Sequence, residues 1–128
     1  MTDKPLPSRE MVAGPSRAPA RAMLHAAGFD DRALSKPLVM PETAGSRHID
    51  YRISMYQPMA HVACHKHLKQ EQIYHVLEGE GAMEIEGRKT IVRRHDVIFI
   101  PPGVRHSIRN DGLTDLTFIV VTTPVEDR

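Results

Sequence analysis

The sequence has little of what marks several classes of protein. Cys64 is the single cysteine, so no disulfide can form within the chain, and cysteine usage gives no sign of an oxidising compartment. The formal net charge is +1 without an evident basic stripe, which gives no reason to expect a nucleic acid or an anionic membrane as a partner. Apolar runs are too short to span a bilayer, and the N-terminus lacks the apolar core of a signal peptide. We therefore expect a cytoplasmic protein.

The length of 128 residues fits one domain that buries a real core. Residues 1–20 hold four prolines among Ser, Arg, Ala and Gly, a composition typical of an irregular arm. Residues 20–27 favour a short helix that ends at Gly28, and residues 30–47, with their two prolines, look irregular. The predicted organisation is an N-terminal arm with a short helix over residues 1–35 and a β-barrel domain over residues 36–128.

The pattern of apolar and polar residues changes at residue 49. Over residues 49–56, apolar and mostly polar side chains alternate with a period of two, which predicts a strand. Short apolar segments then recur at 73–77, 83–85, 90–92, 97–100 and 116–122. Glycine and proline punctuate them, as at Glu86-Gly87 and Pro102-Gly103. Many short strands separated by such turns indicate an all-β sandwich or barrel.

Three histidines predict a metal site. His65 and His67 lie two apart, so on an extended segment their side chains project to the same side, which His61 would share. Imidazole is a good ligand for first-row divalent metals. Pro102-Gly103 fits the central pair of a type II turn, and that turn leads directly to His106, a third ligand delivered by a later strand. The spacing therefore indicates one metal ion bound inside a β-barrel.

The first of these segments also carries a family resemblance. The first motif of the cupin superfamily reads Gly, five residues, His-X-His, three or four residues, Glu, six residues, Gly. Here His65-X-His67 is followed by Gln72 and then, after six more residues, by Gly79.

The second cupin motif reads Gly, five residues, Pro-X-Gly, two residues, His, three residues, Asn. Pro101-X-Gly103, His106 and Asn110 match it at every spacing. With both motifs present over roughly residues 49–123, the chain closely resembles a small single-domain cupin. The resemblance implies a double-stranded β-helix, the jelly-roll barrel of that superfamily.

The chain departs from the motifs at three positions. Met59 and His95 stand where each motif begins with glycine, which concerns turn geometry and does not threaten the site. The glutamate position, measured back from Gly79, holds Gln72, whereas Glu71 fits only the distance from the histidines. We expect Gln72 to be the fourth ligand, because an adjacent residue on a strand faces the other way. If Glu71 turned inward instead, the site would gain a carboxylate.

The resemblance implies one divalent transition metal, and Fe, Mn, Ni, Zn and Cu all suit three imidazoles with an amide oxygen. We expect a small metal-dependent enzyme that acts on an oxygen-bearing or carboxylate substrate. The first activity to test is that of a dioxygenase, which is an oxidoreductase. An isomerase, a cyclase, a lyase, a purely structural metal site, and a cupin that only binds a small molecule or sugar are the alternatives. The family also implies a homodimer.

Other side chains are candidates for contact with the substrate. Tyr74 lies two residues beyond Gln72 and so shares its face, where its phenol is a candidate catalytic group. His61 is a second catalytic candidate, because it shares the parity of His65. Arg105 and Arg109 flank His106, and either could pair with a substrate carboxylate.

Overall fold

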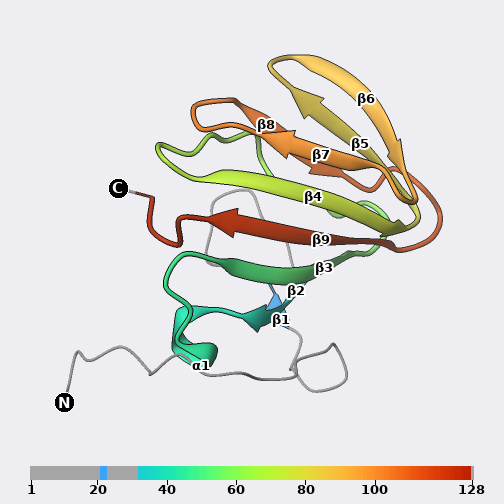
Figure 1. Ribbon diagram of the computed structural model, residues 1–128. Coiled ribbons are helices and arrows are strands. Elements are labelled where there is room, and N and C mark those ends of the chain that lie inside the picture. The colour runs from blue at the N-terminus through green and yellow to red at the C-terminus, as the bar shows by residue number, and fades with distance from the viewer. Residues whose placement is uncertain (1–20, 23–31, 128) are drawn as a thin grey trace.

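A computed structural model describes residues 21–22 and 32–127 (Figure 1). The expected all-β class is confirmed, with one four-residue helix among nine strands in this part of the chain. In chain order the elements are β1 (Arg21–Ala22), β2 (Ala33–Val39), α1 (Pro41–Ala44), β3 (Asp50–Tyr56), β4 (Glu71–Glu78), β5 (Glu80–Ile85), β6 (Arg88–Arg93), β7 (Val97–Ile100), β8 (His106–Arg109) and β9 (Leu116–Thr123). No helix among the described residues is long and apolar enough to cross a bilayer.

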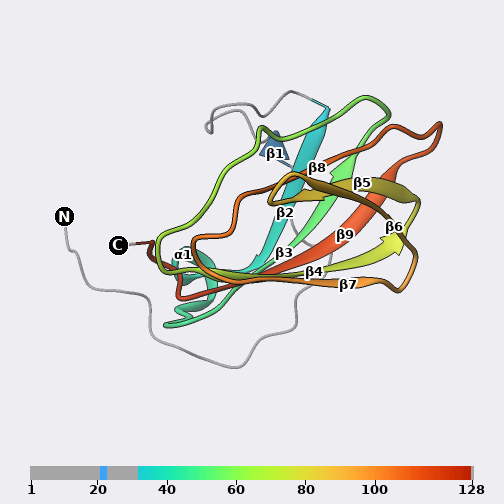
Figure 2. The ribbon, with the colours of Figure 1, turned by 90° about the horizontal axis from the view of Figure 1, so that it is seen from above.

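The strands form two antiparallel sheets. The larger has the order β1-β2-β3-β9-β4-β7, and the smaller has the order β6-β5-β8. Figure 1 shows β5, β6 and β8 above the larger sheet, and Figure 2 shows the same arrangement from the side of the smaller sheet. This is the expected jelly roll, although no strand pairing among the described residues closes the two sheets into one continuous barrel.

Two tight turns connect consecutive strands, one between β5 and β6 and one between β4 and β5. Glu86 and Gly87 join β5 to β6 with φ values of 50° and 78°, the double left-handed conformation of the two-residue hairpin turns whose twist matches that of the strands. Gly79 joins β4 to β5 with φ 83°. An added Cβ there would overlap the carbonyl oxygen of Asp115, so both the backbone conformation and the close approach of a neighbouring chain segment require glycine.

The N-terminal expectations need correction. Strand β2 occupies residues 33–39, which were expected to be irregular, and it pairs along β3. Pro37 lies where the register shifts, and proline is tolerated at such a bulge because its missing N–H is not needed there. The helix expected over 20–27 is wrong for Arg21–Ala22, which form strand β1, while residues 20 and 23–27 lie outside the described residues. The division of the chain at residue 35 stays a prediction.

The core lies between the sheets and draws fully buried side chains from both of them. The largest are Phe118 and Leu116 from β9, Met83 from β5, Ile100 from β7 and Ile108 from β8. Tyr56 packs edge-on against Phe118, with ring centroids 5.1 Å apart, a favourable arrangement for two aromatic rings.

The alternation predicted for residues 49–56 is confirmed in β3. The side chains that face the interior, however, belong to the more polar of the two alternating sets. Ser54 is 2% exposed and pairs with Phe118, which in turn pairs with Val76 on β4. Because β3 and β9 pair without a register shift, Asp50 and Arg52 project to this same inner side. A polar pair therefore lines the interior wall.

Candidate metal centre

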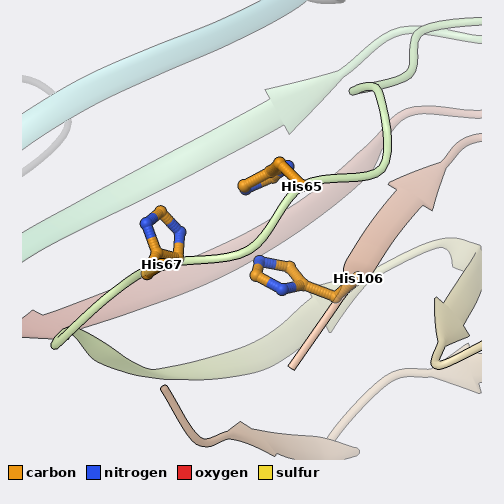
Figure 3. Close-up of side chains that lie close together, drawn as sticks. All are labelled: His65, His67 and His106. Atoms are coloured by element: carbon orange, nitrogen blue, oxygen red, sulfur yellow. The ribbon is translucent and has the colours of Figure 1, made fainter. Parts of the chain in front are cut away.

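The three predicted histidines come together from two segments. His65 and His67 lie on the segment that precedes β4, and His106 is the first residue of β8 (Figure 3). His65 and His106 exchange two backbone hydrogen bonds, His65 N to His106 O at 2.9 Å and His106 N to His65 O at 2.8 Å. The N–H of Gly103 donates to the carbonyl of His67 at 2.8 Å, so the Pro-Gly turn also fixes the second ligand. Backbone pairing thus sets the position of the cluster.

The rings of this histidine cluster (His65, His67 and His106) present their metal-binding atoms to one another. One nitrogen from each ring can be chosen so that all three atoms lie within 4.8 Å of one another. Nδ1 of His65 lies 2.8 Å from the carbonyl of Ala63, and Nδ1 of His106 lies 3.0 Å from that of Val104. A carbonyl only accepts, so both Nδ1 atoms carry the hydrogen and the lone pair is on Nε2.

Three buried side-chain nitrogen and oxygen atoms at the cluster have no hydrogen-bond partner. They are Nε2 of His67, Nε2 of His106 and Oε1 of Gln72. Leaving such atoms unpaired costs about 1–3 kcal/mol each, and a native structure rarely tolerates it without a reason. A divalent cation satisfies several lone pairs at once, so the residues present fit a bound metal.

Gln72 faces the interior, as its parity predicted. It is 9% exposed on β4, and its Nε2 lies 3.1 Å from Oγ1 of Thr122 on the neighbouring strand β9. Glu71 is exposed on the opposite side of the same strand, so the alternative in which it enters the site is wrong. The donor set offered to a metal is therefore three imidazoles and one neutral amide.

Burial lowers the pKa of two of the three cluster histidines. Burial is the largest cause that lowers the pKa of His106, to about 4, and the neighbouring histidines act in the same direction. Burial and the charge of His65 also lower the pKa of His67, against the opposing effect of Asp127. Neutral imidazoles are the form that binds metals, so these two shifts favour metal binding by His67 and His106 near neutral pH.

Tyr74 lies on the inner face beside the cluster. Its ring meets that of His106 nearly at a right angle, with centroids 6.2 Å apart, and packs against Phe118 at 5.3 Å. Burial raises the pKa of the Tyr74 phenol, so the group stays protonated. In this position it can donate a hydrogen bond but is poorly suited to act as a base.

His61 does not face the cluster, and the parity argument that placed it there is wrong. His61 pairs with Arg109, whereas His65 pairs with His106. The first segment therefore advances four residues between these pairs, while β8 advances three. The extra residue turns His61 to the side of Arg109, away from the ligands. It lines a separate pocket of about 270 Å³ together with Cys64, Lys89 and Arg109.

The structure adds an ion pair that the sequence analysis did not identify. Arg52 on β3 donates from Nε and Nη2 to the two carboxylate oxygens of Asp50, at 2.7 and 2.9 Å. The hydrogen bond and charge of Asp50 raise the pKa of Arg52 against the opposing effect of burial. Two charged residues in an alternating strand normally indicate its solvent side, so the sequence held no signal that this pair faces inward.

Comparisons with known proteins agree with the fold and the motifs. A family model described as "Cupin domain" matches residues 52–122. An uncharacterized protein from Methanocaldococcus jannaschii is 40% identical over 60 residues, which make up 47% of this chain and 48% of that protein. An oxalate-binding protein from Thermotoga maritima is 41% identical over 64 residues, 50% of this chain and 53% of that protein. The chain thus spans about half the length of these relatives.

One solved structure is similar over a longer range. The crystal structure of a predicted oxalate decarboxylase from Thermotoga maritima superposes with a TM-score of 0.80 at 28% sequence identity. The match covers 90% of this chain and 100% of that chain.

Proposed function

The chain belongs to the cupin family, and on that premise we propose that its histidine cluster and Gln72 hold one divalent transition metal and that the protein acts on a small carboxylate bound there. The observation that carries the proposal is the convergence of three buried nitrogen and oxygen atoms without hydrogen-bond partners beside a third histidine. Fe, Mn, Ni, Zn and Cu all suit this donor set. When bound, such an ion supplies a Lewis acid for a substrate oxygen.

The carboxylate class rests on two supports. The donor set is neutral, so a bound divalent ion keeps its full charge and attracts anions strongly. The relatives from Thermotoga maritima carry the descriptions oxalate-binding protein and predicted oxalate decarboxylase. Small acids of that kind are therefore the first ligands to test.

In this proposal Tyr74 is a candidate catalytic hydrogen-bond donor. Its protonated phenol beside His106 would stabilise negative charge that develops on a substrate oxygen. Oxygenation, the reaction expected first from the sequence, needs a redox-active metal and stays a prediction. Isomerisation, cyclisation and elimination do not need a redox-active metal.

Binding without catalysis is the second candidate function. The one cluster of potential metal ligands among the described residues holds three histidines and no carboxylate, and Tyr74 stays protonated, so no general base stands out there. A site of this kind would capture an acid without converting it. Incubation of the metal-loaded protein with small acids, followed by product analysis, separates the two functions.

Elemental analysis of the purified protein tests the metal site itself. We expect about one transition-metal ion per chain, lost in His67→Ala and His106→Ala. His75→Ala is the matched control, because His75 lies on β4 with its side chain on the face opposite Gln72. Equal metal content in all four proteins would refute the ligand assignment.

Cobalt substitution tests whether the metal is open to ligands. If azide or oxalate changes the visible spectrum of the cobalt protein, a coordination position is exchangeable, as the proposal requires. An unchanged spectrum would indicate a structural ion with all positions filled. The homodimer also stays a proposal, and sedimentation that shows only a 14.4 kDa species would contradict it.

A further inference from the structure

We propose that Arg52 binds the carboxylate of the substrate, on the inner wall of the same site. The inference rests on the proposed function, since it assumes a metal held by the histidine cluster. It adds a second anchoring point and, with it, the shape of the acid that the site selects.

The strand register places Arg52 on the face of the larger sheet that carries Gln72, the one proposed ligand on that sheet. Gln72 on β4 pairs with Thr122 on β9, and Thr122 pairs with Asp50 on β3. One step along the same inner face, Tyr74 pairs with Val120, and Val120 pairs with Arg52. The ion pair and the ligand Gln72 therefore lie two strands apart on one wall, with Thr122 between them.

The distance across this wall fits a small ligand. Adjacent strands lie about 4.8 Å apart, so the backbones of Gln72 and Asp50 are separated by about 10 Å. The long side chain of Arg52 and the inward reach of the metal ligands shorten the gap between their functional groups. The proposal therefore calls for a ligand of a few carbon atoms between the guanidinium and the metal.

The ion pair with Asp50 orients the Arg52 guanidinium and occupies only some of its N–H donors. Asp50 accepts from Nε and Nη2, which occupies one edge of the planar group. A guanidinium carries five N–H hydrogens, so the Nη1–Nη2 edge still offers a parallel pair of donors to a second carboxylate. Asp50, whose side chain is 14% exposed, fixes the orientation of that edge.

The arginines that the sequence suggested are placed less well for this role. Arg109 projects outward from β8 and contacts Asp111 on the surface, and Arg105 is also exposed. Among these three arginines, Arg52 alone lies on the wall that it shares with Gln72 and Tyr74. The ligand class that follows is a short acid with a metal-binding oxygen at one end and a carboxylate at the other, such as a dicarboxylate or a 2-oxo acid.

Ligand binding to the cobalt-loaded protein tests the inference. Oxalate, malonate and succinate are titrated into the wild type, Arg52→Gln and the matched control Arg105→Gln, which loses the same charge from an exposed position. We expect Arg52→Gln to weaken binding of the best acid by about 10-fold to 100-fold, the size of a charge-assisted bidentate contact, and Arg105→Gln to leave it unchanged. Imidazole, a neutral metal ligand, should bind all three proteins equally.

The double variant Asp50→Asn/Arg52→Gln guards against misfolding, because it replaces the ion pair by two neutral amides without leaving an unpaired buried carboxylate. It should retain metal and imidazole binding and lose the acid. Equal acid affinity in the wild type and both Arg52 variants would overturn the inference and leave the proposed function standing. A wild type that takes up no metal would overturn the proposed function, and the inference with it.

Discussion

The carboxylate of Asp127 lies 3.6 Å from Nδ1 of His67, although 60 residues separate the two in the sequence. The same carboxylate accepts three consecutive backbone N–H groups, from Leu68 at 3.0 Å, Lys69 at 2.7 Å and Gln70 at 3.1 Å. Figure 1 shows the C-terminal end of the chain near the start of β4, where these groups lie. Asp127 thus holds the segment that follows His67 and orients the ring.

Replacing Asp127 with asparagine should weaken metal binding. Partial burial acts to raise the pKa of Asp127, but the three N–H donors and His67 together lower it to about 2, so the group is an anion at neutral pH. Partners that orient a metal-bound histidine are typically worth about 10-fold to 100-fold in metal affinity. Chelator competition with zinc should show a loss of this size for Asp127→Asn. Asp111→Asn, which removes a surface carboxylate paired with Arg109, is the control. Equal zinc affinity in both variants would show that Asp127 does not support the site.

The metal-free protein should lose stability as the pH falls below about 6.5. In the folded chain the pKa of His106 is about 4, because burial disfavours the charged ring, whereas in the unfolded chain it is near 6.5. Between these values the unfolded chain binds a proton that the folded chain does not, so stability is full above pH 6.5 and falls with falling pH. We expect a loss of about 2 kcal/mol at pH 5 relative to pH 7.5.

Urea unfolding in the presence of a chelator measures this loss. His67 shifts in the same direction and adds to it. The variant His106→Gln should show a shallower pH dependence than the wild type. A wild-type stability that does not change between pH 7.5 and 5 would contradict the assigned shift.

Glycine should stabilise the protein at the two positions where the cupin motifs have it. Met59 and His95 adopt φ values of 76° and 75°, in the left-handed region that side chains with a Cβ disfavour. Both side chains are exposed, so little packing is lost on removal. Met59→Gly and His95→Gly should each raise the free energy of unfolding by about 0.5–1 kcal/mol, measured by urea denaturation. Lys89→Gly, on an exposed position of β6, should lower it. A drop in stability for both motif variants would show that these side chains contribute more than their backbone strain costs.

Alanine at two glycines should have unequal effects. Gly79 and Gly87 have similar φ values, 83° and 78°, so both variants pay for the left-handed conformation, about 1 kcal/mol. Only at Gly79 would the new Cβ also overlap the backbone of Asp115, while at Gly87 it meets open space. Gly79→Ala should therefore cost at least about 3 kcal/mol, and Gly87→Ala about 1 kcal/mol, in chemical denaturation. Equal costs would mean that the loop around Asp115 yields without penalty.

Much of the fold was predictable because its signals are local. The period of two in β3, the short apolar segments of β4 to β7 and β9, and the glycine turns between them depend on neighbouring residues only. The same locality explains the success at Gln72, whose inward orientation follows from its place on one uninterrupted strand. Asn110, the last residue of the second motif, has a structural role that the sequence did not predict, since its amide donates to the carbonyls of Tyr56 and Thr114 at 2.8 Å each.

By itself, the sequence determined the family, the strands after residue 49 and the residues that can bind a metal, because residue type and spacing decide these. The tertiary structure decided which side chains meet. An extra residue opposite β8 turned His61 away, the pairing of β3 with β9 brought Arg52 and Asp50 inside, and the C-terminal segment brought Asp127 to His67. Each of these outcomes depends on register or contact between segments distant in the chain, and the period of a single strand does not specify them.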